Sequence, residues 1–455
     1  MSEAAKHKHW SSRSGFILAS IGAAVGLGNV WKFPYITGEN GGSAFVLVYL
    51  LCIIFIALPI LIAEINLGRM GQQSPPRATA RVARRFGRSG KWAVVGWLGI
   101  LSAYLVASYY SVIAGWTLAY MLKNGGGNFT EQSAEVISAE FSTLQASPGL
   151  MTFWHGVFLA TTAIILSRGL RQGVEKSINW LMPLLFALLL LMVAYAWMEG
   201  DMASGLHFLF DFDLGAINGH VVLMAIGHAF FSIGVAMGVM MGFGAYLDND
   251  ISIGKSALII AGTDTVVALV AGMAIFPIVF VNGLDPTEGP GLLFVSLPIA
   301  FGQMPGGLLF GSLFFLLMFF AALTSAIGVL EPVTAWLEEK SGRSRPFSAF
   351  AVCGSLFALG LATVFSFNLW ADWHPLSSIA RFETATFFAL LDYLTANIMM
   401  PIGGLLLAIF AGWLIPTKTL REELNFKSPH LFSTFYWTLR LVAPASIIAI
   451  FYANL

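Results

Sequence analysis

The sequence predicts an all-α protein that crosses a membrane many times and is built from two halves, each opening with an interrupted helix. Of its 455 residues, 57% are hydrophobic and 11% are charged, whereas soluble globular proteins carry about 25% charged residues. Eleven apolar segments reach the roughly 20 residues that are needed to cross the hydrocarbon of a bilayer. The first and the sixth segments each contain closely spaced glycines, which is where a helix is expected to break.

Composition also excludes several function classes. The formal net charge is zero, so nothing indicates a nucleic-acid partner. Cys52 and Cys353 lie in apolar runs, which excludes a disulfide framework and a cysteine zinc site and leaves two small buried hydrophobes. The N-terminus is polar and the first apolar run leads into glycine-rich sequence, so no cleavable signal peptide is expected. No Ser/His/Asp constellation occurs in a matching context, so an enzyme is not expected.

One further apolar stretch lies outside the eleven expected spans. Residues 283–306 are interrupted by prolines and glycines, so we expect a re-entrant or surface hairpin there rather than a twelfth span. The spans are expected at 15–37, 42–69, 92–122, 152–168, 177–199, 219–247, 254–282, 307–337, 347–369, 384–414 and 432–454.

Lys and Arg fall almost entirely on one side of these spans. The expected outside loops keep only Lys123 and Arg381, and the positive-inside rule therefore predicts a cytoplasmic N-terminus and an outside C-terminus in the inner (plasma) membrane. The basic cluster 77–91 is interpreted as a topology signal and not as a nucleic-acid or lipid-binding patch. The expected inside residues are Lys6, Lys8, Arg13, Arg69, Arg77, Arg81, Arg84, Arg85, Arg88, Lys91, Arg168, Arg171, Lys176, Lys255, Lys340, Arg343, Arg345, Lys418, Arg421 and Lys427.

The first span is expected to break within residues 22–34, GAAVGLGNVWKFP. Gly22, Gly26 and Gly28 fall within seven residues, and each glycine weakens a helix by about 1 kcal/mol relative to alanine. A broken helix at membrane depth survives only where it is buried in protein or lines a cavity. Gly22 and Gly26 also form a GxxxG pattern, for which the alternative is close helix packing.

A second interruption, at residues 227–238, favours a transporter. Paired broken spans at matching positions of two halves indicate an inverted repeat with a binding site at the bilayer midplane. Five spans in each half would invert one half relative to the other. We therefore expect an N-terminal cytoplasmic segment (1–14), a first repeat (15–199), a second repeat (219–414, with the hairpin 283–306) and an additional span (432–454).

Long stretches of the chain resemble the neurotransmitter:sodium symporter family, which includes bacterial LeuT-type amino-acid transporters. HWSSRSGFILASIGAAVGLGNVWKFPYITGENGG is similar to the family's first helix, GHAFFSIGVAMG to its broken sixth helix and FFAALTSAIGVLEP to its eighth. The resemblance extends from Trp10 to the last span. It implies a LeuT-like 5+5 inverted repeat with discontinuous first and sixth helices and one additional C-terminal helix, as in family members with eleven spans.

The resemblance also implies two sodium sites. Sodium is a hard cation that takes oxygen ligands, and an unwound helix leaves carbonyl oxygens free. Considered without the family, the hydroxyls of Thr324 and Ser325 have an alternative: they bond back to their own helix. The first ion site would contain Ala24, Asn29, Ser232 and Asp264 together with the substrate carboxylate, and the second ion site would contain Gly22, Val25, Ala321, Thr324 and Ser325.

The implied substrate site lies between the two breaks. Gly26 stands where amine-transporting relatives have an aspartate, so the substrate is expected to bring its own carboxylate. The apolar lining, with flexible Met237, favours an amino acid with a sizeable neutral side chain, although an apolar pocket discriminates weakly. Tyr110 has the alternative of a packed aromatic residue. The implied substrate residues are Ala24, Gly26, Leu27, Gly28, Val106, Tyr110, Phe231, Ser232, Gly234, Met237, Ser325, Ala326 and Val329.

Two gates follow from the same resemblance. Phe231 corresponds to the lid over the substrate, and Lys32 and Asp392 to an extracellular arginine–aspartate pair. Lysine makes a point-charge contact and not a bidentate one, so the outer gate is expected to be looser or water-mediated. Trp10, Tyr246 and Glu339 correspond to the inner gate. The inner arginine is replaced by His7 between Lys6 and Lys8, which leaves the cationic partner open. Gly173 and Pro183 reproduce a motif that allows the fifth helix to unwind in relatives.

Asp264 departs from the family pattern. Most members have asparagine there, and the chloride-dependent ones have a serine one turn later, where this chain has Ala268. A fixed negative charge beside sodium predicts transport without chloride, and protonation of Asp264 is an alternative role. Glu64 and His228 are interpreted as structural hydrogen-bonding groups within spans, and Glu39 as a scaffold carboxylate.

The sequence thus predicts a sodium-coupled symporter that imports a neutral, hydrophobic amino acid by alternating access. Its partners would be that substrate, two sodium ions and the lipid bilayer, with no chloride and no nucleic acid. Three alternatives remain open: a substrate sensor or receptor on the same fold, a transporter of another zwitterion such as a betaine, and an intramembrane hydrolase.

Overall fold

Helices account for the regular structure of this chain. The computed structural model describes residues 9–287, 291–426 and 428–454, and no strand occurs in those ranges. In chain order the membrane-length segments are α2 (Arg13–Ala24) with η1 (Gly28–Lys32) and α3 (Phe33–Glu39); α4 (Ser43–Cys52) with η2 (Ile53–Ala57) and α5 (Leu58–Gly71); η3 (Gly90–Trp92) with α7 (Ala93–Gly125); α9 (Pro148–Ser167); η4 (Leu170–Glu175) with α10 (Lys176–Glu199); α12 (Gly219–Ile233) with α13 (Val239–Gly244); α14 (Ile253–Val281); α16 (Gly307–Ser341); α17 (Arg345–Ser366); α18 (Phe387–Tyr393) with η8 (Leu394–Met399), α19 (Met400–Ile409) and η9 (Phe410–Leu414); and α21 (Pro429–Trp437) with η10 (Thr438–Val442) and α22 (Ala443–Asn454).

These segments coincide with the eleven expected ones. Within the described ranges, nine are single helices long and apolar enough to cross a membrane, and the pair α2–α3, bent by 47°, gives a tenth. The remaining segment, expected at 219–247, is divided into α12 and α13, and neither part is long enough to span alone. Both expected interruptions are therefore present, at the first and sixth segments.

Short helices fill the connections. The stretch 283–306, expected to be a hairpin, contains the short apolar helix formed by η6 (Leu292–Ser296) and α15 (Leu297–Gln303), which packs against α16 and is too short to span. The sequence reading missed four further helices, because it treated their segments as loops: α6 (Pro75–Arg85), α8 (Ala134–Ala146), α11 (Met202–Phe210) and α20 (Thr417–Leu424).

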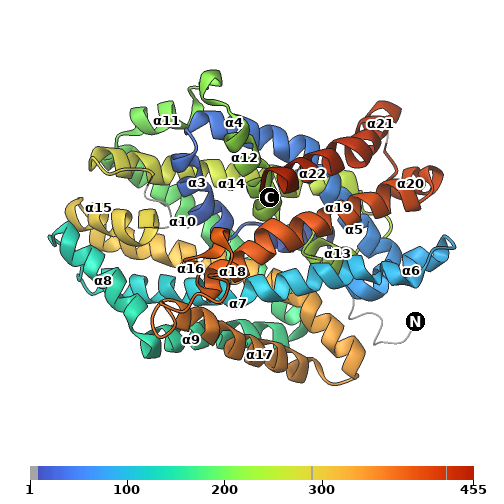
Figure 1. Cartoon of the computed structure of the whole chain (residues 1–455), viewed down its shortest axis with the longest axis horizontal. Coiled ribbons are helices and arrows are strands. Elements are labelled where there is room, and N and C mark those ends of the chain that lie inside the picture. Colours follow the sequence, from blue (N-terminus) through green and yellow to red (C-terminus); the bar gives the residue numbers. More distant parts are fainter. Residues whose placement is uncertain (1–8, 288–290, 427, 455) are drawn as a thin grey trace.

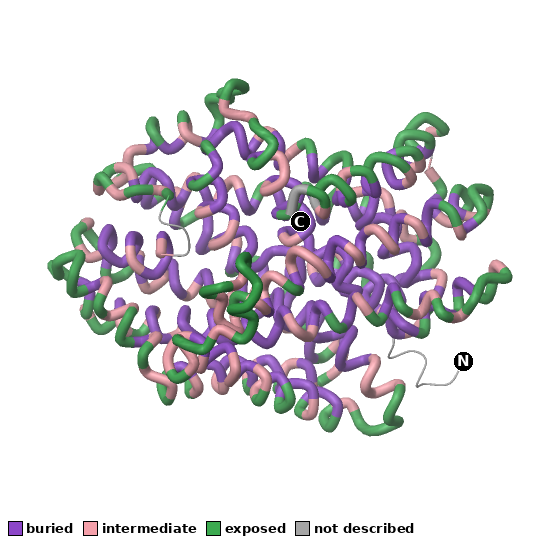
Figure 2. Tube along the Cα trace, in the orientation of Figure 1, coloured by how far each residue is buried: buried purple, intermediate pink, exposed green. Residues whose placement is uncertain are grey.

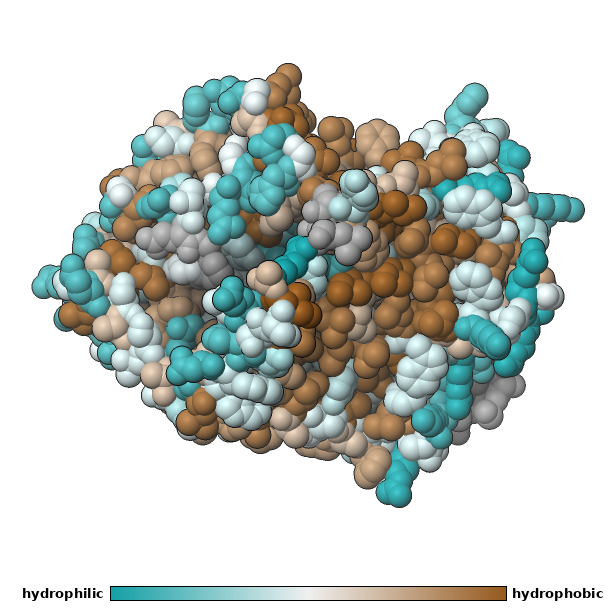
Figure 3. Space-filling view, in the orientation of Figure 1, coloured by the Kyte–Doolittle hydropathy of each residue, from teal (hydrophilic) through white to brown (hydrophobic). Residues whose placement is uncertain are grey.

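The long helices run roughly side by side across the view of Figure 1, with α7 and α16 paired along much of their length near the centre. The ends with α6, α20 and α21 lie on the right, and the end with α8 and α15 lies on the left. Figure 2 shows buried residues along the inner helices and exposed ones mainly at the two ends and on the outer helices. In Figure 3, brown side chains form a broad surface between the centre and the right-hand end of this face, and teal ones border it at that end and are scattered over the left half. A broad apolar surface is expected for a membrane-embedded bundle.

Close backbone approaches hold the two broken helices against unbroken ones. A Cβ added at Gly328 of α16 would lie 2.2 Å from the Cβ of Ala23, near the end of α2. A Cβ at Gly68 of α5 would lie 2.0 Å from the carbonyl oxygen of Met241 in α13. Small residues at helix contacts permit this approach within a membrane, and here they fix where each break lies.

Candidate binding site at the two helix breaks

The first break lies at Val25 and Gly26. Helix α2 ends at Ala24, Val25 has an extended backbone (φ −69°, ψ 107°), and the chain resumes as the π-helical turn η1. The N–H of Leu27 lies in this interruption and donates to the hydroxyl of Tyr110, 3.1 Å away. Tyr110 therefore contributes a polar contact to the break rather than serving only as a packed aromatic residue.

The second break runs from Gly234 to Gly238. Gly234, Ala236 and Gly238 have φ values of 67°, 68° and 71°, a left-handed conformation that costs an alanine about 1 kcal/mol or more. The buried Glu64 of α5 compensates part of this cost, because its carboxylate accepts a hydrogen bond of 2.9 Å from the N–H of Ala236. The expectation that Glu64 is a structural hydrogen-bonding group is confirmed.

Asn29, Ser232 and Asp264 form one buried polar cluster, although they come from η1, α12 and α14. The Asn29 amide nitrogen donates to a carboxylate oxygen of Asp264 at 2.8 Å and to the hydroxyl of Ser232 at 3.2 Å. Ser232 donates to the other Asp264 oxygen at 2.7 Å, and the Tyr49 hydroxyl lies 3.2 Å from Ser232. The oxygen of the Asn29 side chain accepts from the N–H of Gly26 at 3.0 Å. Three segments distant in sequence thus meet at the first break.

The oxygen atoms of this cluster fit a hard cation. Asp264 is fully buried, and no Lys, Arg or His lies within 4 Å of its carboxylate anywhere in the described ranges. A buried carboxylate is costly unless a cation or several donors compensate it. Sodium prefers such oxygen ligands. Three of the four residues expected for the first ion site, Asn29, Ser232 and Asp264, meet in this cluster, and the fourth, Ala24, lines the neighbouring cavity.

The residues expected for the second ion site lie at the contact between α2 and α16. Ser325 donates across this contact to the carbonyl oxygen of Ala23 at 3.0 Å. Thr324 instead bonds to carbonyls of its own helix, those of Phe320 at 3.0 Å and Ala321 at 3.2 Å. The alternative that the hydroxyls bond back therefore holds in this structure for Thr324 and not for Ser325. Both residues are buried and neutral, so this region contains oxygen atoms and no side-chain charge.

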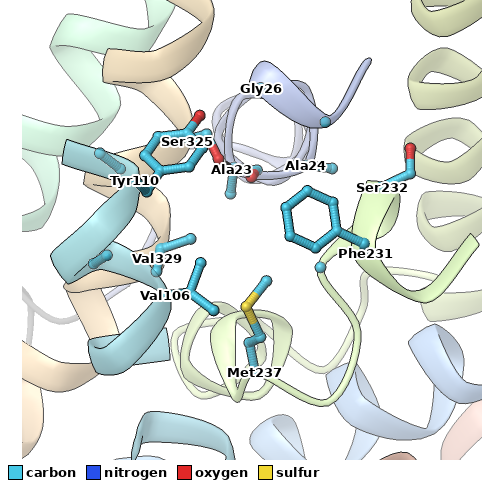
Figure 4. A pocket seen from close by; sticks show the side chains of 14 residues that line it. Ala23, Ala24, Gly26, Val106, Tyr110, Phe231, Ser232, Met237, Ser325 and Val329 are labelled. Atoms are coloured by element: carbon cyan, nitrogen blue, oxygen red, sulfur yellow. Dashed lines mark hydrogen bonds between the residues drawn. The ribbon is translucent and has the colours of Figure 1, made fainter. Parts of the chain in front are cut away.

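A small cavity lies between the two breaks. Figure 4 shows Phe231 and Met237 pointing into it from the α12–α13 region, opposite Val106 of α7. Twelve of the thirteen expected substrate residues line it. The exception, Leu27, is buried beside it and contacts Tyr110 through its N–H. The sequence reading missed Ala23 and Ala107; Ala107 could have been found from the helical spacing between Val106 and Tyr110.

The cavity leaves about 30 Å³ for water-sized molecules, enough for about two waters. A substrate as large as an amino acid therefore requires the lining to move. Met237 is the side chain best able to do so, because it is unbranched and flexible, and its terminal methyl already lies 3.1 Å from the Cβ position of Gly234.

Gly26 has no room for a side chain. A Cβ there would lie 2.8 Å from both the Ser325 hydroxyl oxygen and the Tyr110 hydroxyl oxygen, closer than real Cβ contacts. An aspartate at this position would collide with both residues. The geometry agrees with a site in which any carboxylate comes from the bound molecule.

The outer residues do not form the expected ion pair. In the described part of the chain, no ion pair within 4 Å joins Lys32 to Asp392. The ammonium of Lys32 lies instead 4.0 Å from the ring centre of Phe231, where a cation is attracted to the face of an aromatic ring. A lysine on a flexible stem can take this position, whereas the planar fork of arginine favours a carboxylate.

The expected inner-gate residues Trp10, Tyr246 and Glu339 are each held by contacts with neighbouring segments. Trp10 is buried, donates to the carbonyl of Phe243 at 3.0 Å and has its ring 6.3 Å from that of Tyr246. Glu339 accepts a hydrogen bond from the Ser74 hydroxyl at 2.5 Å, with Arg77 3.6 Å away. Tyr246 and Glu339 line one cavity at this end of the molecule. The expected cationic partners Lys6, His7 and Lys8 lie outside the described residues, as does Lys427.

A second, larger cavity of about 680 Å³ lies at this inner end, lined by Tyr246, Glu339 and residues of the loops around them. The tyrosine hydroxyl is 3.5 Å from Glu331, which forms an ion pair with Arg345. Gly173 and Pro183, the expected point of unwinding, lie in η4 and within α10, and both segments are helical here.

His228 differs from its expectation. It is buried among the rings of Phe33, Phe45 and Tyr49, and neither ring nitrogen has a hydrogen-bond partner among the described residues. It therefore packs as an aromatic ring rather than serving as a structural hydrogen-bonding group.

Comparison with known proteins gives a consistent result over the whole chain. The model of the sodium:neurotransmitter symporter family matches residues 7–132 and 128–455. The chain is 34% identical to the sodium-dependent transporter YhdH of Bacillus subtilis, covering 98% of this chain and 97% of that protein. It is 31% identical to a sodium-dependent transporter of Haemophilus influenzae, covering 98% of each. The crystal structure of MhsT in complex with L-phenylalanine matches with a TM-score of 0.89 and 36% identity, covering 98% of this chain and 99% of that chain.

Proposed function

We propose that this chain, which belongs to the sodium:neurotransmitter symporter family, imports a neutral, hydrophobic amino acid together with sodium by alternating access. It is a sodium-dependent membrane transporter with the LeuT fold and not an enzyme. One observation carries this proposal. The buried cluster of Asn29, Ser232 and Asp264 lies at the helix break that also lines the cavity, with Ser232 common to both.

This arrangement supports coupling between ion and substrate. Asn29 joins the cluster to the N–H of Gly26, and Gly26 lines the cavity. The N–H groups of Gly26 and Leu27, which now donate to Asn29 and Tyr110, and the Tyr110 hydroxyl would be suited to a substrate carboxylate, and that carboxylate would complete the first ion site. Each ligand then raises the affinity for the other by the same factor. The second ion site supplies further oxygen atoms where α2 meets α16.

The amino-acid class follows from the lining and from the relative. The cavity is lined mainly by apolar side chains, among them Val106, Met237 and Val329. MhsT, which shares the fold and 36% of its sequence, was crystallised with L-phenylalanine. Since Gly26 excludes a side-chain carboxylate, the proposal favours an amino acid over an amine.

Chloride independence is proposed from Asp264 and its surroundings. The carboxylate supplies a negative charge beside the first ion site, and no basic side chain lies within 4 Å of it in the described ranges. Ala268, one turn later, is a buried apolar residue. The protein's own carboxylate would then compensate the sodium charge.

Alternating access is proposed to work between the two closed ends. Lys32 over Phe231 covers the outer side, and Trp10 against Tyr246 covers the inner side, with the 680 Å³ cavity beyond it. We retain the division into repeats at 15–199 and 219–414, with the additional span at 432–454, a plasma-membrane location, the cytoplasmic N-terminus and the outside C-terminus as parts of this proposal.

Uptake into proteoliposomes tests the proposal. Purified protein should accumulate a labelled neutral amino acid when a sodium gradient is imposed, and choline in place of sodium should abolish accumulation. Replacing chloride by gluconate should leave the rate unchanged, and collapse of uptake in gluconate would refute chloride independence. Alanine at Asn29 or Thr324 should weaken the sodium dependence.

A panel of twenty amino acids and a betaine, tested for sodium-dependent binding, identifies the substrate class. Binding without accumulation would instead identify a sensor on the same fold, and consumption of the substrate would identify an enzyme.

A further inference from the structure

A basic groove lies at the end of the molecule that carries α6. It is lined by Arg77, Arg81 and Arg84 of α6 and by Lys340 near the end of α16, and the two tryptophans Trp97 and Trp336 form its floor. These six residues are called the basic groove below, which has a volume of about 720 Å³. In Figure 3 teal side chains gather at the right-hand end, where α6 lies, next to the brown surface of the membrane-spanning helices.

The cations of the basic groove are placed by helical spacing and by local contacts. Residues 77, 81 and 84 are four and three positions apart, so they share one face of α6. The guanidinium of Arg84 lies against Gly90, where a Cβ would be 2.9 Å from its Nε. The ammonium of Lys340 lies 5.0 Å from the Trp336 ring centre. Two helices distant in sequence therefore direct positive charge into one space.

An apolar groove adjoins the basic groove and extends from Trp97 to Tyr104 along α7, toward the middle of that helix. It has a volume of about 310 Å³, and Leu101, Val333 and Ala351 are among its lining residues. Trp97 and Trp336 line both grooves, with ring centres 4.9 Å apart. Tryptophan is enriched at the level of lipid headgroups, where an apolar ring can meet a polar layer.

The positive charge of the basic groove favours an anionic ligand. No acidic side chain lines the basic groove, and the nearest balancing group is Glu339, 3.6 Å from Arg77. Arg81, Arg84 and Lys340 are exposed and have no acidic partner within 4 Å in the described ranges. Guanidinium groups bind phosphate oxygens in pairs, and basic pockets between membrane helices bind anionic lipid headgroups.

We propose that the two grooves together form a binding site for an anionic phospholipid of the cytoplasmic leaflet, with its phosphate in the basic groove and an acyl chain in the apolar groove. The side of the membrane follows from the positive-inside orientation proposed above. Residues 77–91, interpreted above as a topology signal, would then also form part of a binding site. The rest of that site comes from α16, which is distant in the sequence.

Native mass spectrometry of the purified full-length protein tests this site. The probes are palmitoyl-oleoyl phosphatidylglycerol and, as the uncharged-headgroup comparison, palmitoyl-oleoyl phosphatidylcholine. The protein should retain phosphatidylglycerol preferentially. The double variant Arg84→Ala/Lys340→Ala should lower its affinity about 25-fold, because each direct contact between a basic side chain and the phosphate contributes about fivefold. Arg77 is left unchanged, because it contacts Glu339 of the inner gate.

A matched variant controls for charge. Arg88→Ala/Lys91→Ala removes two exposed cations of the same cluster that line neither groove and should leave phosphatidylglycerol affinity within about twofold, as expected for removing only diffuse surface charge. An equal loss in both variants, or equal retention of phosphatidylcholine by the wild type, would show that no specific headgroup site exists.

The apolar groove has its own test. Ala351→Phe should fill it and lower the affinity for the long-chain lipid, whereas Ala358→Phe, an exposed position on the same helix that does not line the groove, should not. Dihexanoyl phosphatidylglycerol should bind weakly, and 10 mM inorganic phosphate should not displace the long-chain lipid. Displacement by phosphate, or equal binding of the short-chain lipid, would reassign the basic groove to a free anion.

Discussion

The two proposed ion sites lie on opposite sides of the same helix break and are built differently. The first site is joined across three segments by hydrogen bonds to the Asp264 carboxylate. The second contains only neutral groups, and Ser325 provides its one hydrogen bond from side chain to neighbouring helix. Thr324 remains bonded within α16. The first site therefore joins α14, α12 and the first span by hydrogen bonds, while the second has a single side-chain hydrogen bond between α2 and α16, beside the close packing of Ala23 against Gly328.

This difference indicates a division of labour between the sites. A charged, fully hydrogen-bonded cluster is expected to stay in place through a transport cycle, because separating its partners would leave buried polar groups unpaired. A neutral contact with one cross-helix bond costs little to open. We therefore expect the second site to form and separate as α2 moves, and the first site to carry the charge and the contact with substrate.

The largest effect should follow from Asp264→Asn, which removes the charge that distinguishes the two sites. Sodium-dependent substrate binding should weaken about 100-fold, because the ion loses a buried charged partner. Melting without sodium should change little, because the lost charge has no cationic partner and an amide oxygen can keep one of the two hydrogen bonds that Asp264 accepts, but the sodium-induced rise in melting temperature should become much smaller. Scintillation proximity binding and thermal melting measure the two quantities.

The exposed acid Asp250 supplies the control for this experiment. Asp250→Asn removes one negative charge from a loop and should change neither quantity. If Asp264→Asn binds sodium and substrate as the wild type does, the two sites do not differ in the way described here.

An intermediate effect is expected from Gly26→Ala, which acts between the sites. The added methyl would lie 2.8 Å from Ser325 on one side, and the N–H of Gly26 donates to Asn29 on the other. Overpacking costs about 1–3 kcal/mol, so substrate affinity and sodium affinity should both fall about tenfold. Equilibrium binding titrations with each ligand measure this.

Gly262→Ala makes the same change where the added methyl meets nothing within 4 Å, two positions from Asp264. It should leave both affinities unchanged. A fall in substrate affinity alone for Gly26→Ala would mean that Gly26 does not connect the two ion sites.

The smallest expected effect is a difference in stability without sodium between variants at Ser325 and at Thr324. Ser325→Ala removes the bond to Ala23 and should lower stability without sodium by about 1 kcal/mol, whereas Thr324→Val removes only a bond within its own helix and should change it much less. Both should reduce the stabilisation by sodium. Thermal melting of both variants, each with and without sodium, measures these changes in stability.

Thr334→Val serves as the control, since Thr334 also bonds back to a carbonyl of α16 but lies away from the site. It should keep the full sodium response. Equal stability of Ser325→Ala and Thr324→Val without sodium would contradict the hydrogen-bond pattern that separates them.

The helix breaks were predictable from local sequence, because glycine spacing acts over a few residues. Gly26 and Gly28 indicated the first break, and Gly234 and Gly238 the second. The conformation of Ala236 was not predictable in this way, since alanine disfavours a positive φ and only the distant Glu64 stabilises it here. Most residues of the cavity were named through the family resemblance, whereas the local spacing alone would have left Tyr110 a packed aromatic residue.

At the two gates, the family resemblance predicted residue positions but not the contacts of their side chains. Lys32 occupies the sequence position of an outer gate residue, yet its ammonium lies over Phe231 and not at Asp392. Glu339 occupies an inner gate position, yet it contacts Ser74 and Arg77. A long charged side chain chooses among several partners within its reach, and that choice depends on the helices around it.

The sequence by itself determined that this chain spans a membrane, where its membrane-spanning helices lie and where two of them break, because hydropathy and glycine spacing act locally along the chain. Only the tertiary structure decided which polar groups meet at those breaks, which hydroxyl crosses to a neighbouring helix and how little space remains between Phe231 and Met237. It also joined a basic face of α6 to the end of α16. These outcomes depend on packing between segments far apart in sequence, and hydrogen bonds and charges act only over the few ångströms that this packing sets.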